Sequence, residues 1–197
     1  MYLYEYEAIS DAIRTAGDFY EAPILDDIAR CLPPQRTIVD VGANIGNHSL
    51  YWAAFANPDL VVAVEPVMAS YALLCLNTHD YPAVRTVRSA LSDHDGVERM
   101  TLDPVNMGRS RVARRGLVAV RSMRMDDLGL TDVSLVKIDV EGHQAQVLRG
   151  GIQTLGRDHP DVLIEDEDGS GAGVLEGLGY HHEAEWPGAN HLWQWTP

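Results

Sequence analysis

The sequence of 197 residues is poor in positive charge, in cysteine and in long apolar stretches. It has 15 Lys and Arg against 29 Asp and Glu, a net charge of -14, which argues against nucleic acid as a partner because phosphate backbones are bound by clustered cations. Its two cysteines, Cys31 and Cys75, fall on expected helices in apolar surroundings, so we expect buried free thiols rather than a disulfide. No apolar run approaches membrane-spanning length, and the N-terminus has neither the basic nor the apolar part of a secretion signal. We therefore expect a cytoplasmic protein without a membrane partner.

What the chain does contain is enough apolar sequence, 46% of its residues, for one domain covering residues 1–197. Stretches with strand and helix character alternate along it, which is typical of βαβ units and a parallel sheet. The expected strands are 37–42, 60–65, 84–89, 134–140 and 162–165, and the expected helices are 47–57, 67–78, 143–155 and 172–178. Two further helices, at 4–15 and from Pro23 to Leu32, make residues 1–34 an N-terminal helical cover. The chain ends in an expected hairpin of 180–186 and 191–195.

The alternation is interrupted at residues 96–123, where two expected strands, 97–102 and 117–123, have no helix between them. We interpret this segment as an inserted β-hairpin around a long loop. Residues 99–124 hold seven of the 15 basic residues, all of them arginines: Arg99, Arg109, Arg111, Arg114, Arg115, Arg121 and Arg124. This cationic patch favours an anionic group on a substrate or carrier. It fits equally a solvated hairpin in a chain that prefers Arg to Lys, since Lys137 is the only lysine.

The first expected strand ends in a glycine turn, D-V-G-A-N-I-G, and the second ends at a carboxylate, Glu65. An acidic residue about 20 residues after such a turn is where nucleoside-binding α/β folds hold a ribose diol. The dinucleotide pattern G-x-G-x-x-G is absent because Asn44 replaces the middle glycine, so S-adenosylmethionine fits better than a dinucleotide. The cofactor-binding residues we expect are Asp40, Gly42, Asn44, Gly46, Glu65, Ser89, Ala90 and Leu91.

Polar residues after the later strands are the candidates for chemistry, because ligands bind beyond the carboxyl ends of parallel strands. Asp139 is the first candidate for orienting or deprotonating an acceptor hydroxyl, followed by His143 and Glu165. Asp139, Glu165 and Asp166 also resemble the oxygen ligands of metal-dependent methyltransferases, so Mg²⁺ is a second hypothesis. The residues expected to contact the acceptor are Glu141, Asn106 and Arg109.

Several motifs in this order resemble the FkbM family of S-adenosylmethionine-dependent methyltransferases. They are D-V-G-A-N-I-G (40–46), V-E-P (64–66), A-L-S-D (90–93), N-x-G (106–108), M-D-D-L (125–128), K-I-D-V-E-G (137–142) and L-I-E (163–165). Tyr20-Glu21 also resembles the family's N-terminal pattern. The resemblance implies a Rossmann-like class I methyltransferase fold, an α/β fold whose mostly parallel sheet has seven strands with the last antiparallel. It also implies O-methylation of a hydroxyl on a sugar or natural-product scaffold. The arginine-rich loop and the tail beyond Gly169 carry no motif that identifies the acceptor.

Two other functions stay open at this point. A nucleotide-dependent oxidoreductase would need the missing glycine pattern and a second βαβαβ half. A non-catalytic binding module could use the hairpin carrying Trp186, Trp193 and Trp195 as a homodimer interface, although the combination of Asp40, Glu65 and Asp139 favours an enzyme.

Overall fold

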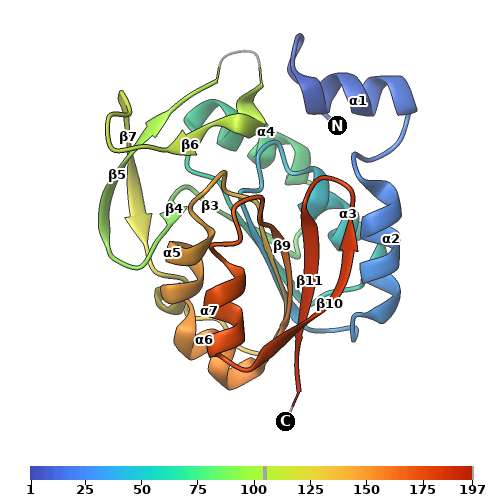
Figure 1. The fold of residues 1–197 in the computed structure, drawn as a ribbon. Coiled ribbons are helices and arrows are strands. Elements are labelled where there is room, and N and C mark those ends of the chain that lie inside the picture. Colours follow the sequence, from blue (N-terminus) through green and yellow to red (C-terminus); the bar gives the residue numbers. More distant parts are fainter. Residues whose placement is uncertain (104–105, 197) are drawn as a thin grey trace.

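The computed structural model describes residues 1–103 and 106–196 and has a seven-stranded sheet at its centre (Figure 1). Its strands are β1 (Thr37–Val41), β2 (Leu60–Val64), β3 (Val84–Val87), β8 (Val133–Ile138), β9 (Asp161–Glu165), β10 (Tyr180–Trp186) and β11 (Asn190–Trp195). They lie in the order β10-β11-β9-β8-β1-β2-β3, and β11 runs antiparallel to both of its neighbours while the remaining pairs are parallel. The α/β class and the antiparallel last strand are confirmed.

Helices cover both faces of this sheet. One face carries α2 (Ala22–Cys31), α3 (Asn47–Phe55) and α4 (Met68–Thr78), and the other carries α5 (Gln144–Arg149), α6 (Ile152–Asp158) and α7 (Ala172–Gly177). In β1, Ile38 packs with Trp52 of α3, whereas Val39 packs with Leu148 of α5 on the opposite side. Successive side chains of a strand point to opposite faces, so a strand covered on both sides must be apolar throughout.

The predicted inserted hairpin is present, but it is part of a second sheet of four strands in the order β4-β7-β5-β6, which the sequence did not predict. These strands are β4 (Ala90–Leu91), β5 (Gly96–Thr101), β6 (Arg111–Val112) and β7 (Val118–Met123). The antiparallel pairing of β5 with β7 is confirmed, but β6 uses the expected loop to pair with the end of β5. Ala90 and Met100 of this sheet pack against Val67, which ties it to the main fold. Residues 104–105 of the expected loop lie outside the described residues.

The predicted helix 143–155 is wrong as a single element, since α5 and α6 are separated by Gly150-Gly151. A Cβ on Gly150 would lie 2.0 Å from the Ser92 carbonyl oxygen, and one on Gly151 would lie 2.9 Å from Met125 Sδ. Both glycines therefore allow close packing against η2 (Met125–Leu128) and the start of the second sheet. Both cysteines are free thiols, as predicted, but neither is fully buried, since Cys31 is exposed and Cys75 is partly buried.

The N-terminal cover consists of α1 (Ala8–Ala16) and α2. Figure 1 shows α1 and the second sheet at the same end of the molecule, beyond the carboxyl ends of the parallel strands. Throughout the described residues, every helix is too short or too polar to cross a bilayer. The assignment of residues 1–197 to one domain stays a prediction.

Candidate active site

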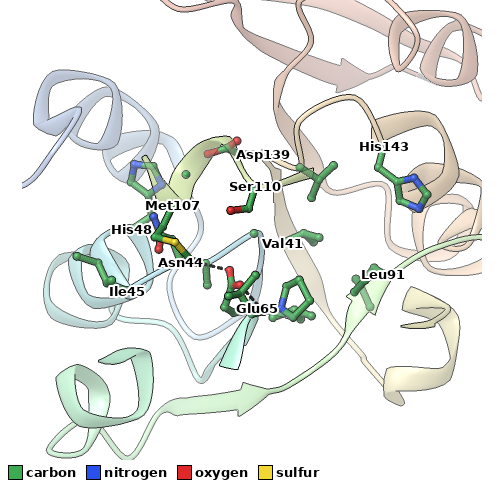
Figure 2. A pocket seen from close by; sticks show the side chains of 18 of the residues that line it. Val41, Asn44, Ile45, His48, Glu65, Leu91, Met107, Ser110, Asp139 and His143 are labelled. Carbon is green, nitrogen blue, oxygen red and sulfur yellow. Dashed lines mark hydrogen bonds between the residues drawn. The ribbon is translucent and has the colours of Figure 1, made fainter. Parts of the chain in front are cut away.

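A pocket of about 870 Å³, counted out to its open mouth, lies beyond the carboxyl ends of β1, β2 and β8 (Figure 2). Its floor includes Val41 and Val64 from the strand ends. Ile9 of α1 and Met100 and Ser110 of the insertion also line it. Open α/β sheets bind ligands at this edge, and here the N-terminal helix and the second sheet together wall it in.

The turn after β1 needs glycine at positions 42 and 46, because a side chain at either position would clash with neighbouring atoms. Gly42 has a φ of +78°, and a Cβ there would lie 1.8 Å from the Asp139 carbonyl oxygen. Gly46 has a φ of +91°, and its Cβ would lie 2.8 Å from Leu74 Cδ1 of α4. Gly42 lines the pocket as expected. Gly46 is not among the lining residues and allows α3 to approach α4, and its predicted contact with the cofactor stays a prediction.

Glu65 follows β2 and projects into the pocket, with 6% of its surface exposed. The backbone N–H of Asn44 donates to Glu65 Oε2 at 3.0 Å, drawn in Figure 2, and the N–H of Val67 donates to Oε1 at 2.7 Å. Burial raises the pKa of Glu65 to about 7. The Asn44 side chain lines the same pocket, and neither its Oδ1 nor its Nδ2 has a partner in the part of the chain that is described. Buried polar atoms are normally paired, so this wall of the pocket is suited to a polar ligand.

Asp40 does not line the pocket, and its predicted contact with the cofactor stays a prediction. It is fully buried, accepts a hydrogen bond from Ser49 Oγ at 2.5 Å, and lies 3.3 Å from Lys137 Nζ. Asp40 and Lys137 are directly paired residues of β1 and β8, so the two side chains point to the same face of the sheet.

Lys137 lines the pocket but was missing from the predicted site residues. Its Nζ donates to the Gly42 carbonyl at 3.2 Å and lies 3.5 Å from Asp139 Oδ2. Burial opposes a charge on Lys137, but the carboxylates of Asp40 and Asp139 outweigh it and raise the pKa of Lys137. Lys137 could have been recognised from the sequence, because it is the chain's only lysine and lies in an apolar strand.

Ser89, Ala90 and Leu91, which were predicted to bind the cofactor, line the pocket. Ser89 Oγ donates to the backbone carbonyls of Ala90 and Arg121, so this hydroxyl is already used within the protein. Ala90 and Leu91 are buried and give this end of the pocket an apolar wall.

His143 also lines the pocket, and Figure 2 shows it at the end where Leu91 lies. Its Nε2 is 3.1 Å from Ser92 Oγ and 3.8 Å from the Glu98 carboxylate, and burial lowers the pKa of His143. These contacts tie His143 to the second sheet, and its catalytic role stays a prediction.

A second space, which we call the acidic hollow, measures about 510 Å³ when the solvent at its open mouth is included. It is lined by Glu141, Gly142, Gln144, Glu165, Glu167 and Asp168. Burial, followed by the charge of Asp139, raises the pKa of Glu165 to about 8, and the same two causes raise the pKa of Glu141. Asp139 lines the pocket, and the hollow begins two residues later at Glu141. The chain segment 139–142 therefore joins the two spaces.

Tyr20 is a lining residue that the list of expected site residues omitted, although Tyr20-Glu21 was part of the family resemblance. Burial raises the pKa of Tyr20, and the charges of Glu21, Glu165 and Asp139 add to it. Asn47 holds the segment by exchanging two hydrogen bonds of 3.0 Å with the Tyr20 backbone. Glu21 pairs with His48 at 3.2 Å, so the N-terminal cover is attached to the pocket at two points.

The acceptor residues expected in the insertion fall in different places. Asn106 accepts a hydrogen bond from the Gly108 N–H at 3.1 Å and is not a lining residue of either space. It therefore shapes the short helix η1 (Met107–Arg109). Arg109 is exposed, and its charge acts on Glu141 at the hollow.

The predicted Mg²⁺ site receives no support. Asp166 is buried, and its Oδ2 accepts hydrogen bonds from the N–H groups of Gly171 and Ala172, both at 3.0 Å. It thus caps the start of α7. Asp139, Glu165 and Asp166 do not form a cluster with ligand atoms at mutual metal-binding distance among residues 1–103 and 106–196. Asp166 is better explained as a helix cap, and Glu165 as a lining residue of the acidic hollow.

Residues 40–195 match the family of the methyltransferase FkbM domain. The chain belongs to this family. The hexuronic acid methyltransferase AglP of Haloferax volcanii is 32% identical over 117 residues, which cover 56% of this chain and 48% of AglP. The methyltransferase sdnD of Sordaria araneosa is 28% identical over 208 residues, covering 81% of this chain and 80% of sdnD. Residues 40–195 therefore form a methyltransferase FkbM domain, which disfavours the oxidoreductase alternative.

The solved FkbM methyltransferase of Methylobacillus flagellatus superposes on 82% of the chain with a TM-score of 0.61 at 15% identity. The chain spans about half the length of each of these two relatives, 44% of the Methylobacillus flagellatus protein and 48% of AglP. A precorrin-6y C5,15-methyltransferase of Geobacter metallireducens superposes on 88% of the chain with a TM-score of 0.57. These likenesses confirm the Rossmann-like methyltransferase fold. The FkbM match begins at Asp40, so Ile9 and Tyr20 of the pocket come from outside the matched region.

Proposed function

We propose that this FkbM family member transfers the methyl group of S-adenosylmethionine to a hydroxyl of a small molecule, a sugar or natural-product scaffold. The observation that supports this most is the arrangement around Asp139. A pocket with a buried carboxylate and an unpaired amide meets an acidic hollow that contains a carboxyl group with a pKa near neutrality.

The pocket residues suit the parts of this cofactor. Glu65 retains lone pairs to accept from two ribose hydroxyls, since each oxygen receives only one backbone N–H bond. The unpaired amide of Asn44 offers a donor and an acceptor to the polar amino-acid tail. Ala90 and Leu91 supply an apolar surface for a base. When bound, S-adenosylmethionine supplies a methyl group already activated by a positively charged sulfur.

Glu165 is our candidate for accepting the proton of the acceptor hydroxyl. A general base works best when its pKa is near the working pH, and burial raises the pKa of Glu165 to about 8. Asp139, held 3.5 Å from Lys137, would orient the hydroxyl at the junction of the two spaces. In this scheme His143 stays on the side of the second sheet and supports the pocket wall.

The acceptor's other groups would meet two different surfaces. Carboxylates of the acidic hollow accept hydrogen bonds from neighbouring hydroxyls of a polyhydroxylated acceptor. Arg109 and Arg111, whose charges act on Glu141, would take an anionic group of an acceptor or carrier. AglP is named for a hexuronic acid, which carries both hydroxyls and a carboxylate, and an acceptor of this kind would use both surfaces.

The test is transfer of a labelled methyl group from S-adenosylmethionine to a panel of neutral sugars, uronic acids and hydroxylated natural products. We expect label in an acid-stable methyl ether and an equal amount of S-adenosylhomocysteine. A protein that binds S-adenosylhomocysteine by calorimetry but labels no member of the panel would favour the non-catalytic alternative. Saturable binding of NAD in the same pocket would contradict the cofactor assignment.

A cytoplasmic location and a homodimer are also proposals. The tryptophans that motivated the dimer are used within the chain. Trp193 is buried, Trp195 stacks on His159 at 3.8 Å, and Trp186 donates to Asp27 at 3.4 Å. Trp186 and Trp195 remain partly exposed, and the sedimentation coefficient of the full chain would test for a dimer.

A further inference from the structure

The hairpin of β10 and β11 brings together three side chains of the kind that bind metal ions, away from the residues of the pocket and the hollow. His182 Nε2 lies 3.2 Å from His191 Nδ1, and His191 Nδ1 lies 4.0 Å from Glu185 Oε2. All three ligand atoms lie within 4.8 Å of one another. From this geometry we propose that His182, Glu185 and His191 bind a divalent transition-metal ion such as Zn²⁺.

An irregularity in the strand pairing places the three side chains on one face. His182 and Glu185 are three residues apart, so in a regular strand they would point to opposite faces. The register shifts between His182 and Ala184, with the result that His182 pairs with Trp193 while Glu185 pairs with His191. A bulge of this type re-aims side chains. Residues 191 and 193 of β11 share a face, so both partners on β10 are turned to it.

The donor set selects the class of ion. Two imidazole nitrogens and one carboxylate oxygen are typical ligands of Zn²⁺, Ni²⁺ and Cu²⁺, whereas Mg²⁺ and Ca²⁺ prefer oxygen ligands alone. His182 and Glu185 are exposed, so water has access to the remaining coordination positions. The Trp193 ring packs edge-on against His182 at 5.5 Å between centroids, which restrains one imidazole in place.

The site would act on the hairpin and not on methyl transfer, because none of the three residues lines the pocket or the hollow. Metal bound across β10 and β11 would link the outer strand of the sheet to its neighbour. Ligand histidines must be deprotonated at the coordinating nitrogen, so affinity should fall in acid.

The test uses the full chain, freed of any histidine tag and of metal, titrated with Zn²⁺ by calorimetry and with Co²⁺ by visible absorption. We expect one ion per chain, a Co²⁺ d–d spectrum, and a melting temperature raised by about 5 °C at an ion concentration about 100 times the dissociation constant. His182→Ala and His191→Ala should each weaken binding at least about tenfold.

His181→Ala is the matched control. His181 precedes His182 on β10, points to the opposite face and lies 3.6 Å from Glu183. The His181→Ala variant should bind Zn²⁺ with a dissociation constant within about twofold of the wild-type value. His191→Gln, which keeps a polar side chain, replaces His191→Ala if the latter melts early without metal. No ion per chain in the wild type, or equal losses in the His181 and His191 variants, would overturn the proposal.

Discussion

Replacing Glu65 with Gln should weaken the binding of S-adenosylhomocysteine at pH 8 by about two orders of magnitude. Hydrogen bonds to a charged acceptor contribute about 1.5–3 kcal/mol each. Two ribose hydroxyls would meet the carboxylate, and Gln keeps one accepting oxygen, so we expect a loss of about 3 kcal/mol, or about a hundredfold. The Gln amide would also face one of the two backbone N–H donors, of Asn44 or Val67, that the carboxylate now satisfies.

The pH dependence gives a second measure of the same interaction. Burial raises the pKa of Glu65 to about 7, and the ribose hydroxyls donate best to the ionised form. The ionised fraction falls from about 0.9 at pH 8 to about 0.09 at pH 6, so wild-type affinity should drop about tenfold over this window. The affinity of the Gln variant should be independent of pH there, because its amide does not titrate.

Calorimetric titration with S-adenosylhomocysteine at pH 6, 7 and 8 measures these affinities for the wild type, for Glu65→Gln and for a control variant. Glu167→Gln is the control, because Glu167 lines the acidic hollow and not the pocket, and it should behave as the wild type. Circular dichroism checks that the Glu65 variant is folded. A folded variant that binds within threefold of the wild type at pH 8 would refute the assignment of Glu65 as the ribose acceptor.

Three further changes test the site and its support. Glu165→Gln should lower kcat by about 10²- to 10⁴-fold, leave cofactor affinity unchanged and abolish a rise in rate with a pKa of about 8; an unaltered pH–rate profile would exclude Glu165 as the base. Lys137→Met should lower the free energy of unfolding in urea by about 3–5 kcal/mol, because it leaves the fully buried Asp40 without a counter-ion. A loss below about 1 kcal/mol would contradict the ion pair. Gly42→Ala should lower the free energy of unfolding by at least about 2 kcal/mol, because its Cβ would lie 1.8 Å from the Asp139 carbonyl oxygen. Gly173 has open space around it, so Gly173→Ala should leave the free energy of unfolding unchanged. Equal losses in the two variants would refute the steric explanation.

The main strands, their mostly parallel direction and the position of Glu65 were predictable because they depend on local patterns. Apolar runs of strand length, separated by helical stretches, specify a sheet covered on both faces. Glu65 directly follows such a run, so its place at the ligand-binding edge follows from chain direction alone. Even the burial of Asp40 was within reach. Residues 38 and 40 share a face in β1, and Ile38 packs beneath α3.

The errors arose where tertiary packing overrides the local pattern. The strands β4 and β6 have two residues each, too few for any periodicity to appear. Gly150-Gly151 interrupts an apolar helical pattern only because Ser92 and Met125, distant in sequence, approach it. Asp166 follows β9 like a metal ligand, but its carboxylate is taken by the N–H groups of Gly171 and Ala172. No pattern in the sequence distinguishes a helix cap of this kind from a ligand.

The acidity of the site fits the charge of the reaction we propose. Lys137 is the buried cation of the site, and Asp40 and Asp139 at 3.3 and 3.5 Å already oppose its charge. Burial and the negative charge of Asp139 raise the pKa values of Glu165 and Glu141, so these two groups report a negative potential at the junction of the two spaces. A sulfonium is attracted by this potential, whereas the neutral thioether of the product is not. The same carboxylates that position the acceptor would thus favour S-adenosylmethionine over S-adenosylhomocysteine and promote exchange of product for substrate.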